Sequence, residues 1–506
     1  MKQYLPPAKS TISNPNRDEL ISLARNMPRA KKTQYGNYNF NTLVNARSAK
    51  STFFVSDQGN GQAYMSREQY EKIAKIQNEH IREQSMLLIE GYIGPDPAFR
   101  VGCQLYIEQS HANIAAMQQQ LYFPSISHFS PDFTIIYTPD LFMPDYPDNR
   151  LIAVDTDNYT TRIMGTDYFG ESKKGGLRMW NKWVYDHGGL AVHAGCKVWP
   201  NINGKEKLAL IIGLSGTGKT TTTFRQQRDS LPVQDDFCAL FPGGKVSATE
   251  NGCFAKTIGL DPNDEPTIYS ALTQPDSWLE NVMVSSEGTV DFTDGSVTTN
   301  GRGTFSLDKI SHRSPINLPD VDLILILNRN FNLIPAVVKL KPEQAAAFFM
   351  LGETTGTSAG GSDEADKFLR VPGTNPFFFS DDALQGNRFL ELMKSMPDVK
   401  VYLLNTGRIG GPDQNPNSIK VLISDSSAIQ EAIVNDSIQW LEDEDFGYYI
   451  AQSIPGISTP HLLNPRLLYK SINRINDYYQ IKEKIKIERM EYLRKYQNLN
   501  KEIIPS

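Results

Sequence analysis

Residues 213–220, which read GLSGTGKT, form the part of the chain whose residue types and spacing most directly indicate chemistry. They match the pattern of glycine, four residues, glycine, lysine and serine or threonine that is typical of phosphate-binding loops. Glycines let backbone N–H groups converge on a phosphate, Lys219 adds a positive charge, and the Thr220 hydroxyl can hold Mg²⁺. The loop therefore predicts binding of a nucleoside triphosphate, and a flexible turn with a surface lysine is the alternative.

Asp235 and Asp236 follow this loop, and Lys173, Lys174 and His193 precede it. A magnesium ion on a triphosphate needs carboxylate help, whereas adjacent carboxylates after a strand are also common in solvated turns. A lone histidine in an apolar stretch is more often a core residue than a ligand. By themselves these residues leave a magnesium role for the acidic pair and ordinary structural roles open.

Short apolar runs predict the elements that position these residues. We expect buried strands of an α/β core at 208–212, 321–327 and 401–405. Mixed three and four spacing predicts an amphipathic helix within 65–90, and a second helix is expected at 341–353. The following segment, 353–375, is rich in glycine, serine and threonine and has the length of a lid or a disordered surface loop. The charged segment 470–498 predicts a surface helix with a solvated face.

The composition limits the class of protein. The chain has 506 residues, a formal net charge of −6, 40% hydrophobic residues and 21% charged residues. These values are typical of globular proteins with about two to three domains, and the acidic charge argues against a nucleic-acid partner. The four cysteines are widely spaced, and we find neither a signal-like segment nor a long apolar run. We therefore expect a cytoplasmic protein with no membrane partner, as a monomer or a small homo-oligomer.

Several stretches, in order along most of the chain, together resemble the ATP-dependent phosphoenolpyruvate carboxykinase family. The GTP-using relatives carry a cysteine in the loop that corresponds to 213–220, and this chain has none there, which favours ATP. The similar stretches are YFGESKKGG (168–176), AVHAG (191–195), GLSGTGKTTT (213–222), ENGCFAKTIGLDPNDEPTIYSAL (250–272), LENV (279–282), NGRGTFSL (300–307), KLKPEQAAAFFMLGETT (339–355), VYLLNTG (401–407) and SDSSAI (424–429).

The resemblance implies a two-lobed α/β fold with a phosphate-loop-containing mixed β-sheet core and an active site in the cleft between the lobes. It divides the chain into a substrate-side domain at 1–190 and a nucleotide- and metal-binding domain at 191–506. The second domain would carry a lid at about 353–375 and the charged helix at about 470–498.

The resemblance also implies roles for metal ligands. Lys174, His193 and Asp236 would bind a transition metal, usually Mn²⁺. Thr220 and Asp235 would serve the Mg²⁺ that accompanies ATP.

A second set of implied roles concerns the substrates. Arg47 would hold the substrate carboxylate, Tyr168 and Lys173 would line the substrate side beside Lys174, and Arg302 would bridge substrate and transferring phosphate. The predicted nucleotide contacts are Leu214, Ser215, Gly216, Thr217, Gly218, Lys219, Thr220, Thr221, Lys420, Val421 and Ser426.

The implied reaction converts oxaloacetate and ATP to phosphoenolpyruvate, ADP and CO₂, in gluconeogenesis or anaplerosis. Decarboxylation, enolate formation and phosphoryl transfer each develop negative charge, so preorganised cations are the main catalytic requirement. A metal-bound Lys174 must be neutral, and we expect Lys173, the metal charge and burial to lower its pKa.

Departures from the family pattern keep two alternatives open. GGLRMWNKW follows the lysine pair in place of an apolar run, FCAL follows the acidic pair, and RSAK surrounds Arg47 without the usual proline and aspartate. Lys420 and Ser426 stand where an arginine and a threonine are expected. One alternative is an ATP-dependent kinase of the same fold that acts on another small acceptor. The other is a non-catalytic nucleotide-binding homologue that uses its carboxy-terminal helix for contact.

Overall fold

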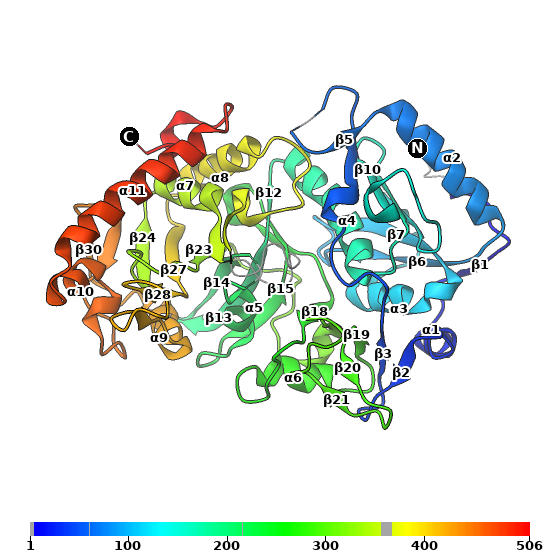
Figure 1. Cartoon of the computed structure of the whole chain (residues 1–506), viewed down its shortest axis with the longest axis horizontal. Helices are drawn as coiled ribbons and strands as arrows, with labels where there is room; N and C mark the ends of the chain where they lie inside the picture. The colour runs from blue at the N-terminus through cyan, green and yellow to red at the C-terminus, as the bar shows by residue number, and fades with distance from the viewer. Residues whose placement is uncertain (1–4, 60, 215, 356–366, 506) are drawn as a thin grey trace.

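The computed structural model describes residues 5–59, 61–214, 216–355 and 367–505 as a mixed α/β protein. Its two largest sheets occupy opposite sides of Figure 1, with the amino-terminal part of the chain in blue and cyan. A smaller sheet of five strands lies at the bottom of this view. Among the helices of the described ranges, none has the length and apolar character needed to cross a membrane.

The amino-terminal sheet has nine strands in the order β1-β6-β7-β9-β11-β10-β4-β5, with β8 paired to β6. Its strands are β1 (Ser10–Ser13), β4 (Thr52–Val55), β5 (Tyr64–Met65), β6 (Ser85–Ile93), β7 (Val101–Glu108), β8 (Phe123–Pro124), β9 (Phe133–Thr138), β10 (Leu151–Asp155) and β11 (Thr160–Met164).

Helices pack on both faces of this sheet. On one face, α3 (Ala112–Leu121) and α4 (Phe169–Asp186) share a core with alternate residues of β7 and β9, and α1 (Arg17–Ala24) packs beside α3. On the other face, α2 (Arg67–Arg82) contributes Ile81 to a cluster with Tyr106 and Ile136. Because both faces are covered, every residue of β7 and β9 is buried.

Two glycines bring α4 close to the sheet and so fix the place of the lysine pair that precedes them. A Cβ added to Gly175 would lie 3.3 Å from Thr161 Cγ2, and one added to Gly176 would lie 3.2 Å from Ile93 Cδ1. These two glycines therefore pack tightly and keep α4 against β11 and β6.

The carboxy-terminal sheet has eight strands in the order β15-β13-β14-β23-β27-β24-β31-β30. Strands β14, β23 and β27 run parallel, whereas β13 and β24 pair antiparallel with their neighbours. The strands are β13 (Ala194–Ile202), β14 (Lys205–Ile212), β15 (Leu231–Asp235), β23 (Val321–Asn328), β24 (Val337–Leu340), β27 (Lys400–Asn405), β30 (Trp440–Glu442) and β31 (Tyr449–Ala451).

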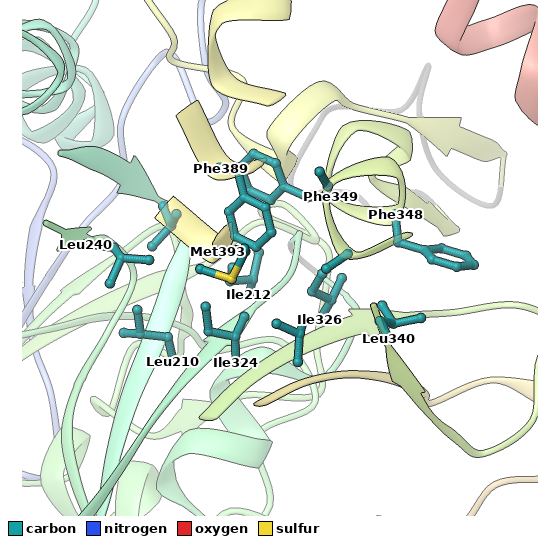
Figure 2. Close-up of a cluster of buried hydrophobic side chains, with 14 of the residues drawn as sticks. Leu210, Ile212, Leu240, Ile324, Ile326, Leu340, Phe348, Phe349, Phe389 and Met393 are labelled. Carbon is teal, nitrogen blue, oxygen red and sulfur yellow. The ribbon is translucent and has the colours of Figure 1, made fainter. Parts of the chain in front are cut away.

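Side chains on the two faces of this sheet enter separate cores. Leu210 and Ile212 of β14 pack with α7 (Pro342–Leu351) and α8 (Ala383–Ser395), where Phe349 and Phe389 stack with centroids 4.4 Å apart (Figure 2). Ile211, with its side chain on the opposite face, packs with α9 (Ile423–Val434). The continuous apolar run of this strand is thus the pattern of a strand buried on both faces.

The five-stranded sheet joins distant parts of the sequence, because β3 pairs with β19 in parallel. It contains β2 (Ala30–Lys32), β3 (Tyr38–Phe40), β18 (Gly252–Lys256), β19 (Trp278–Glu280) and β22 (Arg302–Ser306). The smaller elements are β12 (Leu190–Val192), β16 (Cys238–Leu240), β17 (Val246–Ala248), β20 (Met283–Val284), β21 (Val290–Asp291), β25 (Glu353–Thr355), β26 (Phe368–Arg370), β28 (Arg408–Ile409), β29 (Ile419–Lys420), α5 (Lys219–Phe224), α6 (Pro266–Leu272), α10 (Pro465–Ser471) and α11 (Ile475–Arg494).

The three predicted core strands are confirmed as β14, β23 and β27, and the helix expected at 341–353 is α7. The predicted helix within 65–90 is shorter than its window, because α2 ends at Arg82 and β6 begins at Ser85. All four cysteines are buried and free, as expected of reduced thiols.

The carboxy-terminal part differs most from its prediction. The single helix expected at 470–498 is interrupted at Asn473, whose φ of 56° is left-handed, and α11 buries Arg489 and Leu493 on one side. The prediction of a merely solvated helix is therefore wrong for this face. The predicted loop 353–375 contains the strand pair β25 and β26, and residues 356–366 lie outside the described ranges.

We expect Phe349→Ala to lower the free energy of unfolding by about 3–5 kcal/mol, because it removes a fully buried ring from the stack with Phe389. Urea unfolding followed by fluorescence measures this loss. Phe142→Ala is the matched control, since that ring is exposed, and its effect should stay within about 0.5 kcal/mol. Equal effects of the two substitutions would contradict this account of the core.

Candidate active site

A cavity of about 430 Å³ brings together residues from α4, the 213–221 segment, the end of β15, the five-stranded sheet and the segment 354–377. Most of the predicted site residues line it. These are Arg47, Tyr168, Lys173, Lys174, His193, Leu214, Gly216, Gly218, Lys219, Thr220, Thr221, Asp235, Asp236 and Arg302.

Four predicted nucleotide contacts within the described residues are not among its lining residues. Thr217 is buried beneath the loop, and its hydroxyl donates to the Leu214 carbonyl at 2.8 Å. Lys420, Val421 and Ser426 lie at the β29–α9 junction, where Lys420 is exposed. Ser215 lies outside the described residues.

The 213–220 segment connects the end of β14 to α5. Gly216 and Gly218 have φ values of 89° and 88°, a left-handed conformation that glycine adopts without the steric cost of a Cβ. Lys219 Nζ lies 2.7 Å from Asp235 Oδ1, and the Thr220 hydroxyl donates to Asp235 Oδ2 at 2.5 Å. Despite burial, the carboxylates of Asp235 and Asp236 raise the pKa of Lys219, so its amine stays charged.

Neighbouring strands hold this segment from the side. The Thr406 hydroxyl, just after β27, donates to the Thr217 carbonyl at 2.8 Å, and Arg329, just after β23, donates to the Gly216 carbonyl at 3.1 Å. The Val421 N–H donates to the Gly407 carbonyl at 3.0 Å. The β29–α9 junction is therefore connected to the loop through the end of β27.

Lys197 of β13, which the sequence analysis did not single out, lies beneath the carboxyl end of α5. Its fully buried amine donates to the Thr222 carbonyl at 3.1 Å and to the Arg225 carbonyl and the Gln227 side chain. Burial lowers the pKa of Lys197 to about 7, and its amine supplies hydrogen bonds to carbonyls that lack partners within α5.

A second group of contacts centres on Asp236. Its carboxylate lies 2.6 Å from Lys173 Nζ and 3.1 Å from His193 Nε2. Lys173 also contacts Glu250 Oε1 at 2.7 Å, and although burial opposes its charge, the two carboxylates raise its pKa. Burial raises the pKa of Glu250 to about 7. Glu250 lies in the similar stretch 250–272 but was not predicted as a site residue, because the sequence does not show that it contacts Lys173.

The surroundings of His193 define how its ring can act. Nδ1 lies 3.1 Å from the Thr374 carbonyl, which only accepts hydrogen bonds, so this nitrogen carries a proton. Phe237, the phenylalanine of the divergent FCAL stretch, stacks on the ring with centroids 4.8 Å apart. Nε2 faces the Asp236 carboxylate at 3.1 Å, and either a proton on Nε2 or a cation between the two groups satisfies both.

Lys174 has different neighbours from Lys173. Its amine lies 3.7 Å from Glu171 Oε1, and Glu171 also pairs with Arg178 at 3.2 Å. Burial lowers the pKa of Lys174 to about 8. Glu171 opposes this shift, and the positive charges of Arg178 and Arg47 offset part of the Glu171 effect. The expected lowering is present, but its main causes are burial and these arginines, since Lys173 is paired with two carboxylates.

Asn300, also missed from sequence, links the residues predicted to hold the substrate. Its side-chain oxygen accepts from Arg302 at 3.0 Å, and its amide donates to the Asn45 carbonyl at 2.7 Å and to the Tyr168 hydroxyl at 3.4 Å. The Arg302 guanidinium lies over the Phe254 ring, 5.3 Å from its centroid. Asn300 therefore orients the segments of Arg47, Tyr168 and Arg302 relative to one another.

The cavity has further lining residues that were not among the individual predicted site residues, although three of them lie in the predicted lid segment 353–375. They are Gly170, Leu177, Phe254, Lys256, Ile258, Glu265, Ile268, Thr354, Leu369, Val371, Pro376 and Phe377. Glu265 accepts a hydrogen bond from the Thr221 hydroxyl at 2.8 Å. Lys256 and Glu265 lie in the similar stretch 250–272, so their charges within that stretch were the signal that could have identified them.

A separate group of potential metal ligands lies in the amino-terminal sheet. Side-chain ligand atoms of Glu108, His111 and Asp140 lie within 4.8 Å of one another. His111 pairs with Asp140 at 3.0 Å and His80 with Glu108 at 2.5 Å, so ion pairs account for this group. It contains none of the predicted ligands and does not line the cavity.

We expect Gly195→Ala to lower the free energy of unfolding by about 1–3 kcal/mol, because the added Cβ would lie 1.9 Å from Thr223 Oγ1 of α5. The shift of the urea midpoint measures this cost. The double variant Gly195→Ala/Thr223→Ala should recover part of the loss, since it removes the overlapping hydroxyl. Wild-type stability of the single variant would show that α5 does not require this close approach.

Comparisons with known proteins show the family of the chain. A model of the family described as phosphoenolpyruvate carboxykinase matches residues 9–460. A protein of Aeropyrum pernix named phosphoenolpyruvate carboxykinase (ATP) is 30% identical over 443 residues, which cover 85% of each chain. Proteins of the same name from Afipia carboxidovorans (32% identity, 74% of this chain and 70% of the relative) and Bradyrhizobium diazoefficiens (29%, 83% and 80%) are also similar. The match spans most of the sequence and includes every residue found around the cavity, so the chain belongs to the phosphoenolpyruvate carboxykinase family.

Proposed function

We propose that this protein is an ATP-dependent phosphoenolpyruvate carboxykinase that converts oxaloacetate and ATP to phosphoenolpyruvate, ADP and CO₂. Membership of the family and the names of the similar proteins support this activity. The observation that carries the proposal is that one cavity contains both basic side chains and two adjacent carboxylates. Among them are Lys219, Lys174, Arg302, Asp235 and Asp236. Such an array provides preorganised cations for a reaction whose every step develops negative charge.

The proposed nucleotide site is the segment 213–221. Backbone N–H groups around Gly216 and Gly218 would surround the phosphates of ATP, and Lys219 would balance their charge. Thr220 and Asp235 already contact each other, and both would serve the Mg²⁺ that accompanies ATP. On binding, Lys219 would exchange its contact with Asp235 for the phosphates and leave that carboxylate for the magnesium ion and its waters.

The proposed transition-metal ligands are His193, Asp236 and Lys174. His193 Nε2 and the Asp236 carboxylate, 3.1 Å apart, fit a shared cation, and Mn²⁺ is the ion that the family resemblance implies. The lowered pKa of Lys174 suits a neutral amine ligand, whereas the raised pKa of Lys173 suits a permanent cation. A metal ion in this place would act as a Lewis acid toward the carbonyl oxygen of the substrate.

The reaction then follows from the charges around the substrate. Arg47 would bind a carboxylate of oxaloacetate, while Lys173, held by Asp236 and Glu250, and Arg302, held by Asn300, would face the reacting atoms. The bond to the departing carboxyl group breaks, its electron pair forms the enolate, and CO₂ leaves. The enolate oxygen attacks the γ-phosphorus, and the bond between that phosphorus and ADP breaks. Arg302 would stabilise the charge shared by enolate and phosphoryl group.

We further infer that the cavity lies in a cleft between two lobes, 1–190 and 191–506. Its lining supports this division, because Arg47 and the α4 residues come from the first part and the remaining residues from the second. The pairing of β3 with β19 adds a strand from the first part to a sheet of the second, so the two parts are also joined beside the cavity.

A direct assay tests the activity. Purified protein with oxaloacetate, ATP and Mn²⁺ should form phosphoenolpyruvate and ADP in equal amounts, and Lys219→Met should reduce the rate at least about a hundredfold. Lys205→Met is the matched control at the exposed start of the same β14–loop unit and should keep the wild-type rate. ATP turnover that depends on another acceptor, with no phosphoenolpyruvate, would refute the proposed reaction.

The metal assignment makes a separate prediction. His193→Gln should raise the Mn²⁺ concentration needed for half-maximal activity by about 10–100-fold and weaken Mn²⁺ binding measured by electron paramagnetic resonance. His187→Gln, at the exposed end of α4, is the control and should bind Mn²⁺ like the wild type. An unchanged response of the His193 variant would remove this residue from the ligand set.

A further inference from the structure

The carboxy-terminal helix α11 lies beyond residue 460, where the match to the family ends, yet it contacts the wall of the active-site cavity. In Figure 1 it runs along the outer edge of the molecule beside α7, and Leu493 is buried in the core that α7 and α8 share. Arg489, one turn before Leu493, is only 6% exposed. A charged side chain at such a position requires a partner within the protein.

The partner of Arg489 is Glu353, the first residue of β25. Arg489 Nε lies 3.0 Å from Glu353 Oε1 and Nη2 lies 2.6 Å from Oε2, a bidentate ion pair. Arg370 of β26 also contacts Glu353 Oε1 at 3.0 Å, and Asn328 at the end of β23 donates to Oε2 at 3.3 Å. Despite complete burial, the two arginines lower the pKa of Glu353, so its carboxylate is ionised.

The helix makes two more contacts that fix this group. The Arg489 guanidinium lies over Phe348 of α7, 4.9 Å from the ring centroid, and Figure 2 shows this ring directed away from the stack of Phe349 and Phe389. The Tyr492 hydroxyl donates to the Arg370 carbonyl at 3.3 Å. Helix α11 thus contacts both strands, through the Glu353 side chain and through the Arg370 backbone.

Strands β25 and β26 carry part of the cavity wall. Glu353 pairs with Arg370, and Thr354 pairs with Leu369. Successive side chains of a strand point to opposite sides, so Glu353 turns toward α11 while Thr354 lines the cavity. Leu369 and Val371 line it as well, which places the ion pair directly behind the wall.

The base of this strand pair is tightly packed. Gly352 has a φ of 47°, and a Cβ added to it would lie 1.7 Å from the Val371 carbonyl oxygen. The Val371 N–H donates to the Gly352 carbonyl at 3.2 Å. A displacement of Glu353 would therefore move Val371 and the cavity wall, because the backbones of Gly352 and Val371 are in direct contact.

We propose that Arg489 is a positioning residue of the active site, which acts through Glu353 to hold Thr354, Leu369 and Val371 at the cavity. Helix α11 is on this basis part of the functional unit, and not only a solvated surface helix. The effect on turnover rests on the carboxykinase activity proposed above. The effect on the strands themselves does not, and so it can be measured separately.

The test uses the full-length variants Arg489→Met, Arg489→Lys, Glu353→Gln and the double variant Glu353→Gln/Arg489→Met. Two readouts are measured at a temperature where every variant is folded. They are kcat and KM for oxaloacetate and for ATP, and hydrogen exchange of peptides that cover 353–355 and 367–371. Ile503→Ala is the matched control, since it removes buried side-chain volume from the same core without touching Glu353.

We expect Arg489→Met and Glu353→Gln each to lower kcat/KM at least about tenfold and to speed exchange of both strands by a similar factor. The double variant should be no worse than either single one, because all three lack the same link. Arg489→Lys keeps the charge without the planar fork, so it should fall between wild type and Arg489→Met. Ile503→Ala should lower the melting temperature and leave kcat/KM within twofold of wild type.

Several results would overturn the proposal. They are unchanged exchange of the two strands in Arg489→Met, additive losses in the double variant, or a loss of kcat/KM in Ile503→Ala equal to that of Arg489→Met. If the wild-type protein formed no phosphoenolpyruvate, the proposed function would fail, while strand exchange in the variants would still decide whether Arg489 positions the wall. If Arg489→Met does not fold, the same measurements of kcat, KM and hydrogen exchange on Arg489→Lys and Glu353→Gln decide the question.

Discussion

The structure depends on a balance of buried charges around Asp235 and Asp236. Asp235 meets Lys219 and Thr220, while Asp236 meets Lys173 and His193. Charges removed from water are tolerated only when each has a partner at hydrogen-bonding distance, because an unpaired buried ion loses its hydration without compensation. The two adjacent carboxylates therefore organise two cationic groups on either side of them, and we propose one of these for a triphosphate and the other for an acceptor.

The two large sheets place these groups with little freedom. Strand β15 ends at Asp235, β14 ends where the 213–220 segment begins, and both pair with β13, so backbone hydrogen bonds fix the carboxylate relative to Lys219. On the opposite side, the glycines after the lysine pair let α4 approach β11, which sets the depth at which Lys173 and Lys174 enter the cavity. Close packing thus converts two short sequence motifs into one site.

The same reasoning extends to residues far from the chemistry. Lys197 contacts carbonyls at the carboxyl end of α5, Asn300 connects the segments of Arg47 and Arg302, and Arg489 reaches the cavity wall through Glu353. Lys197 and Arg489 lie outside the family-like stretches and Asn300 begins one of them, and the role of each depends on contacts between segments that are distant in sequence. Their shared feature is a polar group that would be costly to bury without the partner that the fold provides.

The sequence by itself determined the family, the phosphate-loop pattern, the three core strands and most of the residues found around the cavity. It could do so because these features depend on local composition and on motifs that follow one another in order along the chain. Only the tertiary structure decided which charges meet. In the folded protein, Lys173 pairs with Asp236 and Glu250. Burial and the nearby arginines lower the pKa of Lys174. Arg489 of the charged terminal helix points inward to its carboxylate partner. Pairing between distant side chains leaves no periodic trace along a sequence, because it arises only when helices and sheets pack against one another.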